Sequence, residues 1–363
     1  MPPPDILFMP PPDILKEYLP NVADRLPREA LATLPTPVRL HHIRFADTPG
    51  RISIKYDNLT GNVYGGNKVR KLEYIFPLAR KKRCLRIATF GAAGSNHALA
   101  TALYARQSGF ECTCFLARQA TTPLVAATLN QHLLNGTELV HYGGDYRTRI
   151  KTLREHLWGR HAWVIPMGGS SWLGTVGFVA AGLELAAQIA GGEIPLPDRL
   201  YVGAGTMGTA VGIALGLSLA GLHTEVHAVR VSDVSIMNQR ALDTLLKKTA
   251  RMLRRVDSSV PEDLATRTRI RIRDEFFGPG YAQGTEATAR AIAYARDAFD
   301  LNLETTYTGK VMSALLDDWR DITSGNLNVL YWHTYNSVLF DVPDDTPVDA
   351  LAMPEEFLRY FGP

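Results

Sequence analysis

Short apolar segments alternate along the chain with longer segments in which hydrophobic residues recur every three or four positions. The short segments predict strands, and the longer ones predict helices. The predicted strands are Ile52–Lys55, Arg86–Phe90, Glu111–Leu116, Glu138–Tyr142, Ala162–Ile165, Arg199–Val202, Glu225–Val231 and Val329–His333. The predicted helices are Lys71–Arg80, Asn96–Ser108, Pro123–Leu134, Tyr146–Leu157, Gly177–Ala190, Thr209–Ala220, Val234–Arg254, Gly284–Asp300 and Lys310–Ser324.

This alternation is typical of parallel sheets whose two faces are covered by helices. Another strand, with one side facing solvent, is predicted where Arg267, Arg269, Arg271 and Arg273 alternate with Thr or Ile. A barrel needs a regular repeat of eight strand–helix units, and we find no repeat of that kind. We therefore expect an α/β fold with two open, mostly parallel sheets and a cleft between them.

One uncharged segment of 23 residues, Leu200–Leu222, is long enough to span a bilayer. Its glycines at 208, 212 and 216 also resemble a membrane helix-dimer motif. However, the segment holds six glycines, and three of them crowd its first third. A strand, a glycine turn and a buried helix explain this pattern better, so we expect no membrane association.

Length and composition narrow the class of protein further. A chain of 363 residues corresponds to about two domains. Its net charge of +3 does not indicate a nucleic-acid partner. Three cysteines cannot build a disulfide framework, and the N-terminus lacks the charged and apolar regions of a signal peptide, so a cytoplasmic location is expected. The repeated, proline-rich sequence MPPPDIL predicts an extended N-terminal arm.

The first motif with candidate functional residues is GGNKVRKLEY, residues 65–74. Two glycines there precede Lys68 at the start of a predicted helix. A lysine at such a junction can bind a phosphate or form an imine with a carbonyl cofactor. A second motif, GAAGSNHA, follows the strand that ends at Phe90. Ser95 or Asn96 can cap the next helix there, at the strand end where open α/β sheets bind ligands.

A third motif, GAGTMGT at residues 203–209, joins a strand to a helix. Backbone N–H groups at a helix N-terminus, together with Thr206 and Thr209, form a candidate phosphate site. The spacing also matches the GxGxxG pattern of dinucleotide-binding proteins, with Glu225 as the candidate acidic residue. Further along, Tyr281 and Tyr307 each lie beside glycines, in the sequences PGY and YTGK.

In this order, GGNKVRKLEY, GSNHA, GTMGT, PGY and YTGK resemble the pyridoxal-phosphate-dependent family of 1-aminocyclopropane-1-carboxylate (ACC) deaminase and D-cysteine desulfhydrase. The resemblance extends from about residue 39 to about residue 340. It implies the tryptophan-synthase-β-like fold (fold type II), with pyridoxal 5'-phosphate in the cleft between two open α/β domains of a homodimer. We expect an arm and first helix over 1–38, a large cofactor-binding domain over 39–70 and 179–363, and a small domain over 71–178.

The resemblance also implies roles for individual residues. Lys68 would carry the cofactor covalently, Asn96 would contact its phenolic oxygen, and Thr308 would bind its ring nitrogen. Its phosphate would be held by Gly205, Thr206, Met207, Gly208 and Thr209. Residues on the substrate side would be Ser95, Asn96, His97, Tyr281, Tyr307, Thr334 and Tyr335, of which Ser95, Tyr281 and Tyr307 would join Lys68 in catalysis. No metal is expected.

These roles imply a lyase or deaminase that converts a small amino acid into a 2-oxo acid and ammonia. Thr308, where the deaminases carry glutamate, would leave the ring nitrogen mostly unprotonated and favour elimination over transamination. Tyr335 and Asn336 depart from the family, which has two glycines there, and Gly94 replaces a glutamine. The alternatives are β-replacement or racemisation on the same scaffold and, more distantly, a nicotinamide oxidoreductase or a non-catalytic ligand-binding relative.

Overall fold

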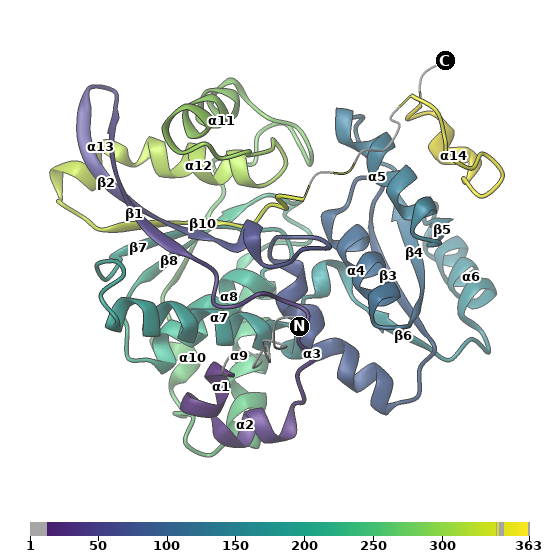
Figure 1. Cartoon of the computed structure of the whole chain (residues 1–363), viewed down its shortest axis with the longest axis horizontal. Helices are drawn as coiled ribbons and strands as arrows, with labels where there is room; N and C mark the ends of the chain where they lie inside the picture. Colours follow the sequence, from purple (N-terminus) through teal and green to yellow (C-terminus); the bar gives the residue numbers. More distant parts are fainter. Residues whose placement is uncertain (1–12, 339, 341–344, 362–363) are drawn as a thin grey trace, which may run out of the picture.

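The computed structural model describes residues 13–338, 340 and 345–361. Its strands form two separate sheets, as the alternating pattern predicts (Figure 1). The predicted extended arm lies almost entirely outside the described residues. In place of one first helix, the described N-terminal segment forms two short helices, because Pro20 begins a new helix directly after Leu19.

The larger sheet has the strand order β1-β2-β10-β7-β8-β9. Its strands are β1 (Val38–Phe45), β2 (Thr48–Tyr56), β7 (Arg199–Ala204), β8 (Glu225–Arg230), β9 (Ile270–Arg273) and β10 (Val329–His333). All neighbouring strands are parallel except β1 and β2, which form an antiparallel hairpin. The hydrophobic pattern does not predict β1, since this edge strand has a mixed polar sequence, VRLHHIRF, that lacks an apolar run.

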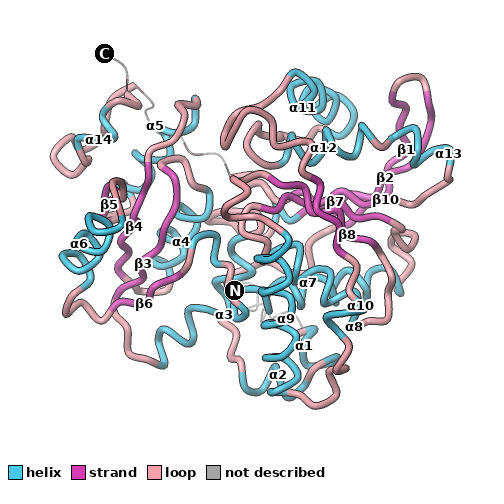
Figure 2. Tube along the Cα trace, turned by 180° about the vertical axis from the view of Figure 1, so that it is seen from behind, coloured by secondary structure: helices cyan, strands magenta, loops and turns pink. Residues whose placement is uncertain are grey.

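The smaller sheet is entirely parallel, with the order β5-β4-β3-β6. Its strands are β3 (Arg86–Ala92), β4 (Glu111–Ala117), β5 (Glu138–His141) and β6 (Ala162–Ile165). Helices α4 (Asn96–Gln107), α5 (Pro123–Leu134) and α6 (Tyr146–Leu157) connect or flank these strands (Figure 2). All four strands fall within the predicted small domain, whose limits themselves stay a prediction.

The remaining elements cover the larger sheet or join the two sheets, except α14, which lies beside the smaller sheet. They are α1 (Ile14–Tyr18), α2 (Pro20–Arg25), α3 (Lys68–Lys81), α7 (Trp172–Ala190), α8 (Gly208–Leu219), α9 (Gln239–Val256), α10 (Leu264–Arg267), α11 (Glu286–Phe299), α12 (Thr308–Asp317), α13 (Trp319–Ser324) and α14 (Glu355–Leu358), with 3-10 turns η1 (Asp57–Leu59) and η2 (Met167–Gly169). The predicted helix Lys310–Ser324 is thus two helices, and the one predicted from Val234 begins only at Gln239. Helix α14 lies beside the smaller sheet, where Glu356 pairs with His141 (Figure 1).

The uncharged segment Leu200–Leu222 forms a strand, a turn and a buried helix, as predicted. These are the end of β7, the glycine loop that joins it to α8, and α8 itself. Helix α8 packs closely on α7, since a Cβ at Gly182 of α7 would come within 2.5 Å of the Ile213 carbonyl oxygen. Helix α7 is long and apolar enough to cross a membrane, but 83% of its most apolar window is buried inside the protein. The small residues therefore serve helix packing in the core.

Buried ion pairs hold helix α3 in place beneath the cleft between the two sheets. Arg70 pairs with Asp57 at 2.8 Å and with Glu184 of α7 at 2.9 Å, and Lys55 of β2 reaches the same glutamate at 2.5 Å. Burial opposes the charge of Glu184, yet Arg70 and Lys55 lower its pKa to about 2. Since these four side chains join β2, η1, α3 and α7, they hold α3 and Lys68, its first residue, in a defined place.

Candidate active site

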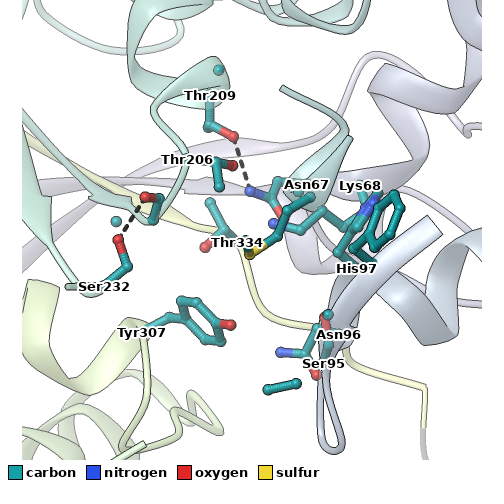
Figure 3. Close-up of a pocket in the computed structure, with 18 of the residues that line it drawn as sticks. Asn67, Lys68, Ser95, Asn96, His97, Thr206, Thr209, Ser232, Tyr307 and Thr334 are labelled. Atoms are coloured by element: carbon teal, nitrogen blue, oxygen red, sulfur yellow. Dashed lines mark hydrogen bonds between the residues drawn. The ribbon is translucent and has the colours of Figure 1, made fainter. Parts of the chain in front are cut away.

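A cavity of about 610 Å³ lies between the two sheets. Every site residue predicted from the sequence lines it. These residues are Lys68, Ser95, Asn96, His97, Gly205, Thr206, Met207, Gly208, Thr209, Tyr281, Tyr307, Thr308, Thr334 and Tyr335. Figure 3 labels eight of them: Lys68, Ser95, Asn96, His97, Thr206, Thr209, Tyr307 and Thr334. They come from the starts of α3, α4, α8 and α12, from the loop between β9 and α11, and from the loop after β10. The topology therefore brings the separate motifs to one place, while their chemical roles stay predictions.

Lys68 enters this cavity because the preceding backbone turns sharply. Gly66 has a φ of +90°, and a Cβ on it would lie 2.6 Å from the Thr334 carbonyl oxygen. Glycine is thus required on both conformational and steric grounds. Burial lowers the pKa of Lys68 to about 8, although the charge of Glu304 opposes this shift. Lys68 is therefore more readily available as an uncharged amine near neutral pH than an ordinary lysine.

Lys71 also lines the cavity, one helical turn after Lys68. Its Nζ donates to the Gly168 carbonyl oxygen at 2.9 Å and to Ser170 Oγ at 3.1 Å, and no ion pair with a carboxylate is found for it among the described residues. Burial, and then the charge of Lys68, lower the pKa of Lys71 well below its usual value. A buried lysine without a counter-charge fits an anionic group bound next to it.

The glycine loop before α8 supplies the other half of an anion site. Met207 caps α8 in a left-handed conformation, with a φ of 64°. The first N–H groups of a helix lack intrahelical acceptors, so those at the start of α8 remain available to a phosphate. A Cβ on Gly208 would lie 2.9 Å from Lys71 Nζ, which places that lysine beside the loop. Asn67 Nδ2 donates to Thr209 Oγ1 at 3.0 Å and ties the loop to the start of α3 (Figure 3).

The start of α4 forms the wall contributed by the smaller sheet. Ser95 is its N-cap, and its Oγ accepts a hydrogen bond from the Ala98 N–H at 3.3 Å. Asn96 Oδ1 accepts from the Tyr64 hydroxyl at 3.0 Å, which leaves the amide nitrogen of Asn96 as a donor toward the cavity. That orientation fits the phenolic oxygen of pyridoxal phosphate.

His97 has internal partners for both ring nitrogens. Nε2 lies 2.8 Å from Thr89 Oγ1, and Nδ1 lies 3.5 Å from Thr101 Oγ1. Burial, followed by the charges of Lys68 and Lys71, lowers the pKa of His97 well below its usual value. The ring is therefore neutral, and a contact between His97 and a substrate carboxylate would use its backbone N–H or its ring edge.

Tyrosines line the side of the cavity formed by the larger sheet. The hydroxyl groups of Tyr281 and Tyr307 are hydrogen-bonded to each other. Burial raises the pKa of Tyr281 to about 12 and that of Tyr307 well above its usual value. Lys310 donates to the carbonyl oxygens of Phe277 and Gly280, at 2.5 and 3.1 Å, and so holds the loop that carries Tyr281.

Tyr335 and Asn336, which depart from the family, play different parts. Tyr335 lines the cavity, and burial raises the pKa of its hydroxyl to about 12. Asn336 Oδ1 accepts from the N–H groups of Gly65 at 2.6 Å and Val338 at 2.9 Å. Asn336 therefore fixes the glycine turn before Lys68, and Tyr335 adds bulk to the cavity.

Among the cavity-lining residues that the sequence patterns did not identify are Tyr64, Lys71 and Glu304. Lys71 could have been found from its spacing, because residues three apart share one face of a helix. Glu304 precedes Thr308 by four residues in an irregular segment, so no periodic pattern marks it. Tyr64 is equally hidden, since only the fold brings it to Asn96.

Comparison with known proteins agrees with this geometry. Residues 30–334 match the model of the pyridoxal-phosphate dependent enzyme family. The chain is 33% identical over 318 residues to nocardicin C-9' epimerase of Nocardia uniformis subsp. tsuyamanensis, which covers 85% of this chain and 92% of the epimerase. It is 31% identical over 307 residues to D-cysteine desulfhydrase of Salmonella paratyphi A, covering 81% and 88%.

A solved structure described as an ACC deaminase homologue superimposes with a TM-score of 0.71 at 27% identity, covering 89% of this chain and 94% of that one. The family match assigns pyridoxal phosphate as the cofactor, and not a dinucleotide. The fold-type-II architecture inferred from the motifs is confirmed. This chain is a pyridoxal-phosphate dependent enzyme of the ACC deaminase and D-cysteine desulfhydrase family.

Proposed function

We propose that this enzyme removes the α-proton of an amino acid and eliminates its β-substituent, and that water then hydrolyses the resulting 2-aminoacrylate to a 2-oxo acid and ammonia. The observation that carries the proposal is the partly uncharged Lys68, in one cavity with the α4 N-terminus and the Tyr281–Tyr307 pair. Pyridoxal phosphate, when bound, supplies an electron sink that makes the α-carbon of the substrate acidic. The side chains of this chain then bind the substrate and move its protons.

Lys68 is the base in this proposal. Its amine can take the α-proton in its uncharged form, which the pKa of about 8 makes available near neutral pH. The substrate carboxylate would bind at the start of α4, where the N–H groups of Asn96 and His97 have no intrahelical acceptor. Ser95 and Thr334 line the same cavity and can add hydrogen bonds from their hydroxyl groups.

The tyrosine pair is suited to protonate the leaving group. A raised pKa keeps the hydroxyl groups of Tyr281 and Tyr307 protonated, and their mutual hydrogen bond lets one hydroxyl stabilise the other as it gives up a proton. Lys310 keeps Tyr281 in place through the loop that it binds. Elimination of a thiol, a hydroxyl or a similar β-substituent needs such an acid.

Epimerisation is the second candidate, because one relative at 33% identity is an epimerase. Inversion at the α-carbon requires that one group removes the proton and another returns it. Lys68 and the Tyr281–Tyr307 pair offer two proton-carrying groups in the same cavity. The choice between elimination and inversion then depends on whether the substrate carries a leaving group at its β-carbon.

A panel of D- and L-amino acids in deuterated water separates these reactions. Elimination yields a 2-oxo acid and ammonia, with sulfide from cysteine, whereas epimerisation places deuterium at the α-carbon of both enantiomers. β-Replacement would yield product only when an added nucleophile is present. The Lys68→Ala variant is the negative control. Absence of all these products, with no deuterium exchange for any substrate, would contradict the proposal.

Assembly and location stay predictions. A homodimer is expected from the resemblance, and light scattering on the purified holoenzyme tests it. A cytoplasmic location is expected from the cysteine content and the N-terminal sequence, and cell fractionation tests that.

A further inference from the structure

Glu304 is a charged residue in the cavity wall that the proposed reaction does not use. Its carboxylate accepts hydrogen bonds from the backbone N–H groups of Thr306 at 2.6 Å, Tyr307 at 2.9 Å and Thr308 at 2.8 Å. It therefore caps the start of α12, where acceptors for free N–H groups are needed. Its side chain also reaches Thr308 Oγ1, at 3.1 Å.

This last contact fixes the orientation of the Thr308 hydroxyl. A hydroxyl has one proton to donate, and an ionised carboxylate can only accept. The Thr308 proton therefore points at Glu304. The same oxygen accepts from the Glu304 N–H at 3.0 Å, which occupies one of its two acceptor positions. Toward the cavity, Thr308 can offer only its remaining lone pair.

We propose that Glu304 is a positioning residue that makes Thr308 a pure hydrogen-bond acceptor, so that the ring nitrogen of bound pyridoxal phosphate is held protonated. This inference rests on the proposed function, in which Thr308 faces that nitrogen. An acceptor can hydrogen-bond a ring nitrogen only when the nitrogen carries a proton. The result differs from the expectation that an uncharged threonine leaves the nitrogen mostly unprotonated, because that expectation did not include the carboxylate behind the threonine.

The negative charge of Glu304 also favours protonation of the ring nitrogen. It raises the pKa of Lys68 and of Lys310, in each case against the burial that lowers it. The other titratable groups on which its charge acts are buried tyrosines with raised pKa values: Tyr64, Tyr281, Tyr307, Tyr331 and Tyr335. Among these groups Glu304 is the anion, and it favours a positive charge on a neighbouring ring nitrogen.

The test is nitrogen NMR of the holoenzyme loaded with pyridoxal phosphate that carries ¹⁵N in its ring. In the wild type, the ¹⁵N shift should be that of a protonated pyridine. In Glu304→Ala it should move to that of a neutral pyridine, because the Thr308 hydroxyl then lacks the carboxylate that accepts its proton and can donate to the ring nitrogen. Thr308→Val should also give the chemical shift of a neutral pyridine, and it leaves the bonds from Glu304 to the backbone in place if Glu304→Ala folds poorly.

Two matched variants should keep the protonated shift. Thr308→Ser retains the hydroxyl, and Glu286→Gln removes a carboxylate whose side chain is 96% exposed on α11. The ¹⁵N shift of a neutral pyridine in the loaded wild type, or that of a protonated pyridine in both Glu304→Ala and Thr308→Val, would overturn this inference alone. A wild type that retains no cofactor would overturn the proposed function as well.

Discussion

Lys68 and Lys71 lie three residues apart on one face of α3, and both side chains enter the same cavity. The first has a pKa of about 8, and burial together with the charge of Lys68 lowers the pKa of the second well below its usual value. Two lysines so close together, with no ion pair to a carboxylate among the described residues, repel each other. A phosphate beside Lys71 would offset that repulsion and leave Lys68 free for covalent chemistry.

Replacing Lys71 with methionine should therefore weaken cofactor retention and leave the attachment residue unchanged. A charge-assisted hydrogen bond contributes about 1.5–3 kcal/mol, which corresponds to roughly a 10- to 100-fold rise in the dissociation constant of pyridoxal phosphate. Titration of the apo-protein measures this change. Lys81→Met, at the exposed end of α3, is the control. Equal retention by Lys71→Met and the control would argue against a phosphate at Lys71.

Gly208→Val should block the phosphate loop sterically. A Cβ on Gly208 would lie 2.6 Å from Ser170 Oγ and 2.9 Å from Lys71 Nζ, which leaves no space for a branched side chain. We expect loss of pyridoxal phosphate on dialysis. In the same loop, Gly205→Ala should lose less cofactor, because its Cβ has 3.7 Å of clearance from Val231. Binding of NAD in place of pyridoxal phosphate by the wild type would contradict this view of the loop.

The reactivity of Lys68 should depend on pH with a midpoint near 8. Below that pH its ammonium form predominates and cannot attack a carbonyl, and above it the free amine predominates. The rate at which apo-protein takes up pyridoxal phosphate should therefore rise with pH and level off above about 8, as followed by stopped-flow absorbance. Glu304→Gln should lower the midpoint, because the charge of Glu304 raises this pKa. A rate that keeps rising toward 10.5, the ordinary value for lysine, would contradict the prediction.

Arg70→Ala should destabilise the protein strongly. It leaves Asp57 and Glu184 buried, and breaking a buried ion pair from one side costs about 3–5 kcal/mol in the free energy of unfolding. Arg80→Ala removes an arginine whose side chain is 56% exposed in its pair with Glu29 and should cost about 1 kcal/mol or less. Urea denaturation of both variants measures the difference. Similar midpoints for the two would show that the buried network does not anchor α3.

The motifs identified residues that line one cavity because each motif is local. A glycine turn before Lys68, a cap at Ser95 and a helix start at Thr209 can be recognised within a few residues, and parallel strands bring their carboxyl ends together. The sequence patterns did not identify Glu304 and Tyr64, because only the tertiary fold brings these residues to their partners. Asn336 lines the cavity next to Tyr335, and the tertiary fold adds a contact that the sequence did not indicate, in which its side chain accepts from the Gly65 N–H.

Tyr335→Gly should change substrate preference. An aromatic ring adds contact surface on the order of 150 Å² or more, so the wild type should turn over D-cysteine and ACC poorly. Removing the ring should raise the activity on D-cysteine, since Thr308 and Thr334 follow the desulfhydrase pattern. Asn336 is left unchanged, because its bonds to Gly65 and Val338 hold the loop. Wild-type kcat/KM of about 10⁴ M⁻¹s⁻¹ or more on either substrate would show the idea is wrong.

Borohydride reduction of the purified holoenzyme tests most directly whether Lys68 carries pyridoxal phosphate. Reduction should fix the cofactor to the protein, and peptide mass spectrometry should place the adduct on Lys68. Lys68→Ala should show neither the adduct nor the absorbance band of lysine-bound cofactor. An adduct mapped to Lys71 or to any other lysine, with Lys68 unmodified, would contradict the account.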